Sequence, residues 1–564
     1  MMPESNMSVG NRSGRWVELP NGRRLAWQGV HSGPLVLRDA EITQLADLLL
    51  GLSPAEVEQE ASRRLHCTPP AGNAPAIVLY SATPLKMGYE ASIQSIVDGR
   101  SFDDPASYVE TRSVYLAGPD DLVVGRLKPW RDAVELAGLQ SVNVDYLDHY
   151  YFSHALLRLA ADHPRGGIEA TDKLVHWLRK RPTATVKVYA LDRPIQIFLL
   201  WLARLAGLSR LHVLANEPGI SDTWVRKSTL HPKVTDVVDM PTALLSGDPD
   251  RLLKAEHEFA AFQQELGLEL PSIPGYTIVP ADEHYDVMDQ ILLAAKFLRE
   301  RYGLKLGCFK FSRTGTGEGI RTGVDLADHS TLRAVSHDIL ANREESVLEA
   351  HLFYSVLDVS GYQFKLAPSA HIEAGAVAPG MTLQFLRDTA WEGNVYFDES
   401  YRLGLTATQY ATIRDSMARL VRAFAQVAEQ PERGGLTKGG VDFGIGRLNG
   451  RFGDRVVVAA QDLNLFSHGA EYLRAFLAKT TAARANHSPQ VYGATKVVRP
   501  GAAATLATLV QATGGFEHDR HCEPIASVPG QWAMIAAAAP DPGRAVEQIL
   551  RYEQHLLAHK LITG

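Results

Sequence analysis

Five short runs of apolar and β-branched residues alternate with helical segments between residues 76 and 216, and this alternation constrains the fold most strongly. We expect strands at 76–82 (AIVLYSA), 113–118 (SVYLAG), 141–147 (SVNVDYL), 185–191 (TVKVYAL) and 210–216 (RLHVLAN). Nearly continuous apolar strands between helices are typical of a parallel sheet covered by helices. The pattern predicts a Rossmann-like α/β domain over 76–240. No Gly-x-Gly-x-x-Gly loop follows these strands, so a dinucleotide site is not indicated.

Composition excludes several classes of function. The formal net charge of −7 provides no basic field that would attract nucleic acid. The most apolar stretch, 195–208, contains Arg204 and is shorter than the roughly 20 residues that span a bilayer. It predicts a buried helix and no membrane association. The three cysteines (Cys67, Cys308 and Cys522) lie far apart in the sequence and fit a reducing compartment, so we expect a cytoplasmic protein.

The length of 564 residues suggests about three to four domains. Asn21-Gly22 favours a tight hairpin turn, and Ser53-Pro54 is typical of a helix start. A linker rich in proline, glycine and alanine follows at 70–75. We expect a small hairpin and helix module over 1–70, the Rossmann-like domain over 76–240, a core over 241–478 and a C-terminal α/β region over 479–564.

A glycine-rich loop follows a short apolar strand in the segment 307–320 (GCFKFSRTGTGEGI). Lys310 lies at the exit of the strand, and Gly315, Gly317 and Gly319 alternate with other residues. Alternate glycines let backbone N–H groups converge without an intervening Cβ, and such a nest beside a lysine suits phosphate oxygens. The spacing matches neither the Walker pattern nor Gly-x-Gly-x-x-Gly. A glycine-rich hairpin turn is therefore the alternative interpretation.

Two apolar strands joined by the turn GRLNGRFGD carry three polar side chains with hard oxygen atoms: Asp442 on the first strand, and Asp462 and Asn464 on the second. Asp462 and Asn464 share a face because strand side chains alternate with period two. Two carboxylates and an amide oxygen suit Mg²⁺, which binds through one or two carboxylates plus substrate phosphates. The alternative, surface charges on a hairpin, is disfavoured because unpaired carboxylates in apolar strands are costly.

Two further candidates are a glutamate and a lysine. Glu349 is the single acid in the apolar run 346–353, and it could accept hydrogen bonds from ribose hydroxyls or an adenine amine. A buried structural acid is the alternative. Lys254 lies on a predicted amphipathic helix and could serve as a second lysine for a polyphosphate. A solvated helix face is the alternative for Lys254, and Lys227 is its rival.

The order of these segments resembles the ATP-grasp superfamily of carboxylate–amine ligases, over about residues 240 to 475. The segments GLELPSIPGYTIV and LKLGCFKFSRTGTGEGI resemble that family's entry turn, phosphate lysine and glycine loop. VLEAHLF resembles its hinge strand, and GGVDFGIG…VVVAAQDLNLFSHG its metal hairpin. The layout is similar to peptide ligases of the pheganomycin type. The resemblance implies a Rossmann-like N-terminal (pre-ATP-grasp) domain, an ATP-grasp core of two α+β subdomains and a small C-terminal region.

The resemblance also implies an ADP-forming ligase that makes a peptide-like amide bond through an acyl phosphate. The cofactors would be ATP and Mg²⁺, and the partners small-molecule or peptide carboxylates and amines, with a homodimer left open. The nucleotide would contact Lys254, Lys310, Gly315, Gly317, Gly319 and Glu349. The metal would contact Asp442, Asp462 and Asn464.

Two departures from the family pattern leave alternatives open. Asp462 stands where the family usually has glutamate, and Phe466 stands where several members have arginine. Arg387, Arg447 or Arg451 could supply the anion-stabilising charge, and the sequence does not choose among them. A non-catalytic nucleotide-binding protein with a degenerate ATP-grasp core is therefore the main alternative. A glycosyltransferase-like double α/β protein is the third interpretation.

Overall fold

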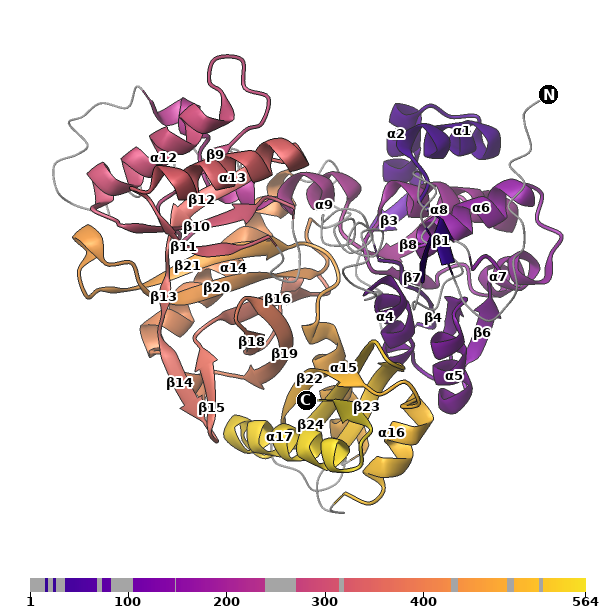
Figure 1. Ribbon diagram of the computed structural model, residues 1–564. Helices are drawn as coiled ribbons and strands as arrows, with labels where there is room; N and C mark the ends of the chain where they lie inside the picture. The colour runs from indigo at the N-terminus through magenta and orange to yellow at the C-terminus, as the bar shows by residue number, and fades with distance from the viewer. Residues whose placement is uncertain are drawn as a thin grey trace.

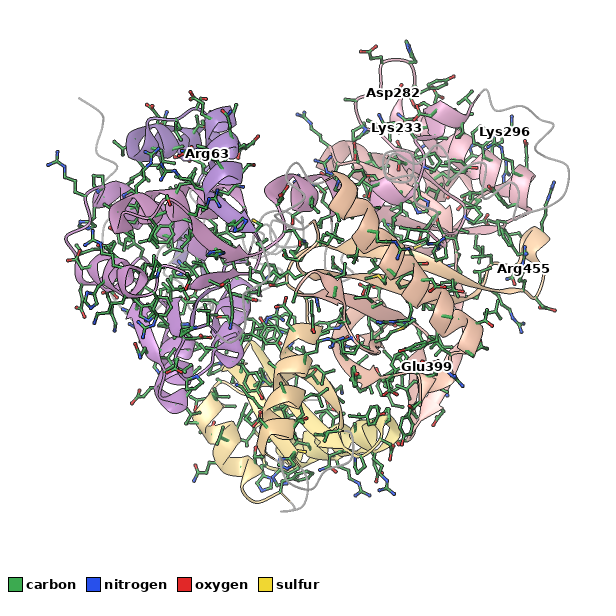
Figure 2. All side chains as sticks on the ribbon, turned by 180° about the vertical axis from the view of Figure 1, so that it is seen from behind. Arg63, Lys233, Asp282, Lys296, Glu399 and Arg455 are labelled. Atoms are coloured by element: carbon green, nitrogen blue, oxygen red, sulfur yellow. The ribbon has the colours of Figure 1, made fainter. Side chains whose placement is uncertain are left out.

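The computed structural model describes residues 16–18, 24–26, 36–67, 74–82, 105–147, 149–238, 270–313, 319–427, 435–483, 491–516 and 521–563. Figure 1 shows an N-terminal body in indigo and purple beside a larger body coloured from magenta to orange. The yellow C-terminal elements lie below and between the two. Figure 2 shows the molecule from behind, with exposed charged side chains such as Arg63, Lys296 and Glu399 at its surface.

The N-terminal body is built on a six-stranded parallel sheet in the order β3-β8-β7-β4-β5-β6. Its strands are β3 (Leu65–Cys67), β4 (Ala76–Leu79), β5 (Leu122–Gly125), β6 (Gln140–Asn143), β7 (Thr185–Val188) and β8 (Leu211–Leu214). Its helices are α1 (Asp39–Leu50), α2 (Pro54–Arg64), α4 (Pro105–Arg112), η1 (Ser113–Leu116), α5 (Lys128–Ala137), α6 (Phe152–Asp162), α7 (Glu169–Lys180) and α8 (Arg193–Ala206). The predicted Rossmann-like parallel sheet is confirmed.

The strand predicted at 113–118 is wrong. Helix α4 continues directly into the 3₁₀ turn η1, which buries Val114 in the core. The missing sheet position is taken by β5, which begins after a turn in which Asp121 accepts from the Gly118 and Ala76 N–H groups. The apolar residues at 113–118 thus fill the core from a helical turn rather than from a strand.

Strand β3 of the N-terminal segment joins this sheet, whereas the two strands before it form a sheet of their own. The short strands β1 (Trp16–Glu18) and β2 (Arg24–Ala26) pair as the predicted antiparallel hairpin. Strand β3 pairs with β8 at one edge of the parallel sheet, and helices α1 and α2 pack on α8. The domain boundaries expected from the sequence stay predictions, since the module before residue 70 shares a core with the domain that follows it.

The second body begins with a four-stranded antiparallel sheet in the order β11-β10-β12-β9. Its elements are β9 (Gly275–Ile278), α12 (Val287–Tyr302), β10 (Leu306–Phe311), β11 (Arg321–Asp325), α13 (His329–Asn342) and β12 (Ser346–Ala350). Helices α12 and α13 pack together and cover the sheet with an apolar core. Before this sheet, the chain passes through α9 (Pro218–Trp224), η2 (Lys227–Leu230) and η3 (Val234–Val237).

The second body and the C-terminal region share an antiparallel sheet of eleven strands. Its main order is β13-β20-β16-β18-β19-β22-β24-β23. Its strands are β13 (Phe353–Tyr354), β16 (Pro368–Glu373), β17 (Ala376–Val377), β18 (Met381–Arg387), β19 (Ala390–Phe397), β20 (Gly439–Arg447), β21 (Val456–Asn464), β22 (Tyr492–Pro500), β23 (His521–Val528), β24 (Trp532–Ala539) and β25 (Ile562–Thr563). The remaining elements are β14 (Val356–Val359), β15 (Tyr362–Lys365), η5 (Arg402–Gly404), α14 (Ala407–Val427), η7 (Gly450–Phe452), α15 (Ala470–Ala483), α16 (Leu506–Thr513) and α17 (Pro542–Ala558).

A parallel sheet followed by antiparallel α+β units confirms the predicted fold class. Strands β22, β23 and β24 of the C-terminal region continue the large sheet beyond β19. Among the helices of the described ranges, none combines the length and the hydropathy that a membrane crossing requires.

The two bodies meet at the carboxyl ends of the parallel strands. Asn216, just after β8, donates from Nδ2 to the carbonyls of Lys438 and Leu465, at 2.8 and 2.7 Å. The Ser467 N–H donates to the carbonyl of Tyr189, just after β7. The start of β20 and the end of β21 thus contact the carboxyl edge of the parallel sheet, which is the edge where open α/β sheets bind ligands.

Candidate functional site

The β20–β21 hairpin brings its three predicted polar residues onto one face. In its register Asp442 lies opposite Asp462, and Gly440 lies opposite Asn464. Asn464 Nδ2 donates to Asp442 Oδ2 at 2.9 Å, and Ser369 Oγ donates to Asp442 Oδ1. The two carboxylates and the amide therefore form one cluster, as the period-two argument requires.

A β-bulge adds a residue to this face that the sequence analysis missed. The register shifts between Asp442 and Phe443, because Phe443 pairs with Ala460 and Gln461 is left as the extra residue. A bulge bends its strand and re-aims the side chains around it. Gln461 Oε1 accepts a hydrogen bond from Lys310 Nζ at 2.8 Å. Simple alternation would have placed Gln461 on the face opposite Asp462, so no pattern in the sequence indicated this contact.

Lys310 lies inside a buried ion pair. It is on β10, 5% exposed, with Nζ 2.5 Å from Glu349 Oε1 on the neighbouring strand β12. His231 Nε2 lies 2.9 Å from the other oxygen of Glu349. Burial opposes both charges but is outweighed by the pairing. The pKa of Lys310 is raised above its ordinary value, and the pKa of Glu349 is lowered to about 2. Both groups are charged, and removing one partner of such a buried pair costs about 3–5 kcal/mol.

Both carboxylate oxygens of Glu349 thus contact protein groups. The predicted contact of Glu349 with a nucleotide stays a prediction. His231 was not singled out from the sequence, because it lies 118 positions from Glu349 and no spacing links the two.

Lys227 supplies a second buried cation. It is 5% exposed, and its Nζ lies 3.3 Å from Asp462 Oδ2. Its backbone N–H donates to the Ser312 carbonyl at the end of β10, and Ser228 N–H donates to Ser312 Oγ. The turn η2 therefore ties the small antiparallel sheet to the hairpin. Lys227 had been only the rival of Lys254, which lies outside the described residues.

The glycine loop is described only at its end. Gly319 is exposed and has φ +67°, a conformation that favours glycine. Gly315 and Gly317 lie outside the described residues. The loop joins β10 to β11, which pair antiparallel, so its flanking strands are those expected from the sequence.

The three arginines left open by the sequence each contact a partner outside the hairpin cluster. Arg387 pairs with Glu392 at 2.6 Å, and Arg447 pairs with Asp454 at 3.2 Å. Arg451 donates to the Glu300 carbonyl at 2.9 Å. Phe466 is buried, with its ring centroid 5.4 Å from that of Tyr189. None of these contacts places Arg387, Arg447 or Arg451 beside the hairpin cluster, so the anion-stabilising arginine stays unassigned.

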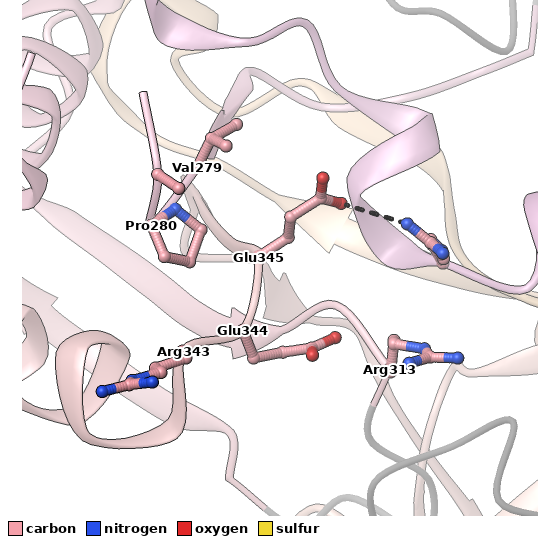
Figure 3. A pocket seen from close by; sticks show the side chains of 8 residues that line it. Val279, Pro280, Arg313, Arg343, Glu344 and Glu345 are labelled. Carbon is pink, nitrogen blue, oxygen red and sulfur yellow. Dashed lines mark ion pairs between the residues drawn. The ribbon is translucent and has the colours of Figure 1, made fainter. Parts of the chain in front are cut away.

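A surface pocket of about 250 Å³ lies at the ends of β9 and β10 and the start of β12 (Figure 3). It is lined by Arg226, Val279, Pro280, Ala281, Arg313, Arg343, Glu344 and Glu345. Arg226 lies 3.9 Å from Glu345, and Ser228 Oγ donates to the same carboxylate at 2.9 Å. Arg226 and Ser228, the neighbours of Lys227 in the sequence, both contact Glu345 in the lining of this pocket.

The donor set of the hairpin can be tested against the metal that the family resemblance implies. In the described part of the chain, no three histidine, cysteine, aspartate or glutamate side chains cluster as a metal site. The hairpin instead offers two carboxylates and an amide. This set is too small and too hard for a structural zinc site, but it fits Mg²⁺, which takes its remaining ligands from water and substrate phosphates.

Comparison with known proteins gives only distant structural likenesses. No family model matches the chain, and no curated protein matches it. One similar structure is N5-carboxyaminoimidazole synthase from Aspergillus clavatus with ADP and 5-aminoimidazole ribonucleotide. It is 11% identical over 86% of this chain and 99% of that chain, with a TM-score of 0.39. Another is D-cycloserine synthetase DcsG, 14% identical over 64% of this chain and 98% of that chain, with a TM-score of 0.29.

A third similar structure is an ATP-grasp superfamily protein from Archaeoglobus fulgidus. It is 9% identical over 83% of this chain and all of that chain, with a TM-score of 0.33. All three similar structures have sequence identities below 25% and TM-scores below 0.5, so they carry no argument about the activity or the substrate of this chain.

Proposed function

We propose that this chain is an ADP-forming ATP-grasp ligase that joins a carboxylate to an amine. The observation that carries the proposal is the meeting of two buried lysines with the hairpin cluster. Lys310 contacts Gln461, and Lys227 contacts Asp462. Two ammonium groups and two carboxylates converging between two sheets have the charges needed for a polyphosphate and its cation.

The reaction proposed has two steps. The γ-phosphoryl group of ATP passes to a carboxylate oxygen, which gives an acyl phosphate and ADP. The amine nitrogen then forms a bond to the acyl carbon and loses a proton, while the bond from that carbon to the phosphate oxygen breaks and inorganic phosphate leaves. Positioning and charge neutralisation are the protein's main contributions to phosphoryl transfer.

The residues of the cluster divide these tasks. Lys310 and Lys227 would hold phosphate oxygens by charge-assisted hydrogen bonds. Asp442, Asp462 and Asn464 would hold Mg²⁺, which when bound neutralises developing phosphate charge. Ser369 and Asn464 donate to Asp442 and fix its orientation. The nucleotide roles of Lys254, Gly315, Gly317, Gly319 and Glu349 belong to the proposal, as do the peptide-like product, a homodimer and a cytoplasmic location.

A second candidate function is favoured by one observation. The ammonium group of Lys310 is already held by Glu349 and Gln461. A lysine committed to protein partners suits a nucleotide-binding protein that does not turn over, as the alternative of a degenerate core requires.

The test is release of ADP and phosphate with a panel of acids and amines, together with ATP binding by calorimetry. We expect ATP to bind and phosphate release to require both an acid and an amine. Binding without phosphate release for any pair would favour the second candidate, and absence of ATP binding would overturn both.

A further inference from the structure

Lys310, Glu349 and His231 form a buried chain of side chains in the small antiparallel sheet. Glu349 on β12 contacts the Lys310 ammonium group with one carboxylate oxygen at 2.5 Å, and its other oxygen lies 2.9 Å from His231 Nε2. His231 is 3% exposed and Glu349 is 2% exposed. The proposed function gives a task to Lys310 but none to His231, which directly follows η2.

The histidine is the donor in the contact between His231 and Glu349. Glu349 is ionised, because its Oε1 lies against the ammonium group of Lys310 and its pKa is lowered to about 2. An ionised carboxylate can only accept hydrogen bonds. His231 Nε2 therefore carries a proton, whether the ring as a whole is neutral or charged.

The fold accommodates this contact at a glycine. Gly275 on β9 lies opposite Glu349 in the register of the sheet. A Cβ at Gly275 would lie 2.7 Å from the His231 ring and 2.7 Å from Glu349 Cβ, closer than real Cβ contacts. The backbone beside His231 is held as well, because the Thr277 N–H donates to the Pro232 carbonyl at 2.8 Å. Strand β9 therefore fixes the place of the histidine ring against Glu349.

The contacts of Lys310 fix the direction of its ammonium group. A lysine ammonium group has three N–H donors. Glu349 accepts from one of them, and Gln461 Oε1 on the hairpin accepts from another at 2.8 Å. Within the described part of the chain, no further acceptor contacts this group. Two fixed donors determine the direction of the third N–H, which is the donor left for a phosphate oxygen.

We infer that His231 is a positioning residue for Lys310 and acts through Glu349. This inference rests on the proposed function, in which Lys310 binds a phosphate. The Nε2–H of His231 holds one oxygen of Glu349, so that only the other oxygen faces Lys310. A buried acceptor is costly to leave unpaired. Without His231, both oxygens of Glu349 therefore turn to the ammonium group and withdraw a second donor from the phosphate.

Three substitutions separate positioning from support of the fold. His231→Leu removes the donor to Glu349. His231→Gln is the conservative variant, because its amide Nε2 can donate in place of the imidazole N–H. His154→Leu is the matched control: His154 is 1% exposed, and its Nδ1 accepts the Leu37 N–H at 3.0 Å in the N-terminal body. Each protein is titrated with ATP by calorimetry, with and without Mg²⁺ and in the absence of acid and amine.

We expect His231→Leu to weaken ATP binding about tenfold, equally with and without Mg²⁺, because Lys310 contacts the phosphates rather than the metal. His231→Gln should recover most of the affinity. His154→Leu should lose stability but bind ATP as the wild type does. In protein that carries Lys310→Met and Glu349→Gln, His231→Leu should have no further effect, because its route to the phosphate is already removed.

Two results would overturn the inference. One is unchanged ATP affinity in His231→Leu, and the other is an equal loss of affinity when His231→Leu is added to Lys310→Met and Glu349→Gln. A wild-type protein that binds no ATP would instead overturn the proposed function.

A spectroscopic measurement tests the chain of side chains without nucleotide. In ¹⁵N NMR spectra of protein labelled at histidine, the signals lost in His231→Gln belong to His231. We expect Nε2 of His231 to be protonated at neutral pH and its resonance to shift in Glu349→Gln. An unprotonated Nε2, or an Nε2 resonance that Glu349→Gln leaves unmoved, would contradict the inference whether or not the protein binds ATP.

Discussion

The parallel sheet of the N-terminal body and the large antiparallel sheet handle polar residues differently. Strands β4 and β5 are buried at every position and carry only apolar residues and one glycine. Strand β16 is also buried along most of its length, but it alternates Ser369 and His371 with apolar neighbours. Strands β4 and β5 are therefore apolar on both faces, whereas the antiparallel sheet has a buried face with hydrogen-bonding side chains.

On the proposed function, the polar face of the antiparallel sheet carries the reaction, and the apolar strands of the parallel sheet stabilise the fold. Polar groups are costly to bury unless they are paired, and Ser369, His371, Thr382 and Asn394 are each hydrogen-bonded within this face. The parallel sheet contributes instead through its carboxyl edge, where Asn216 anchors β20 and β21. Substitutions in the two sheets should accordingly affect different measured quantities.

The largest expected effect is on turnover, in the hairpin. Asp442→Asn and Asp462→Asn should each lower phosphate release by several orders of magnitude with an accepted acid and amine, because charge stabilisation by the metal is lost. Circular dichroism should show the fold retained. Turnover like that of the wild type in both variants would mean that the hairpin is structural.

The opposite effect is expected in the parallel sheet. Leu79→Ala on β4 removes a side chain that is 1% exposed, and it should lower the free energy of unfolding by about 2–5 kcal/mol. Phosphate release per folded molecule should not change, because Leu79 packs in the core of the N-terminal body, which is separate from the core that holds the apolar residues of the hairpin. Urea denaturation measures the stability. A drop in phosphate release from fully folded Leu79→Ala would contradict the separate roles of the two sheets.

Lys310→Ala should affect both quantities. It should weaken ATP binding by about 1.5–3 kcal/mol, as expected for loss of a hydrogen bond to a charged group. It should also destabilise the fold, because Glu349 is left as an unpaired buried carboxylate. The double substitution Lys310→Met with Glu349→Gln is the control, and it should recover stability without recovering ATP affinity. Undiminished affinity in Lys310→Ala, by calorimetry, would remove Lys310 from the nucleotide site.

Much of the fold and of the candidate site was accessible from the sequence. Period-two alternation placed Asp462 and Asn464 on one face, and the apolar runs located four of the five parallel strands predicted. Gln461 was missed because a bulge interrupts the alternation. His231 was missed because its contact with Glu349 depends on tertiary packing. The contact of His371 with Thr382 joins two strands that are separate in the sequence, and no local pattern specifies it.

A smaller effect is expected from pH. The pKa of Glu349 is lowered to about 2 from an ordinary 4.5, so its pairing stabilises the fold fully above pH 4.5. This contribution should be lost progressively as the pH falls from 4.5 toward 2. In Glu349→Gln that part of the pH dependence should be missing. Unfolding curves at several pH values measure it, and identical profiles for the two proteins would show that Glu349 is not ionised in the fold.

The smallest expected effect concerns an exposed ion pair. Arg447 is 53% exposed and pairs with Asp454, which is 95% exposed. Arg447→Ala should change stability by less than about 1 kcal/mol and leave turnover unchanged. A large fall in phosphate release would make Arg447 the anion-stabilising arginine that the sequence left open.

The central claim is that the polar face of the β20–β21 hairpin binds the metal–nucleotide complex. The most direct measurement is calorimetric titration of ATP with and without Mg²⁺, for the wild type and for Asp462→Asn. We predict that Mg²⁺ strengthens ATP binding to the wild type and that this strengthening is largely lost in Asp462→Asn, while ATP alone binds the two proteins about equally. The same Mg²⁺ dependence in both proteins would contradict the account.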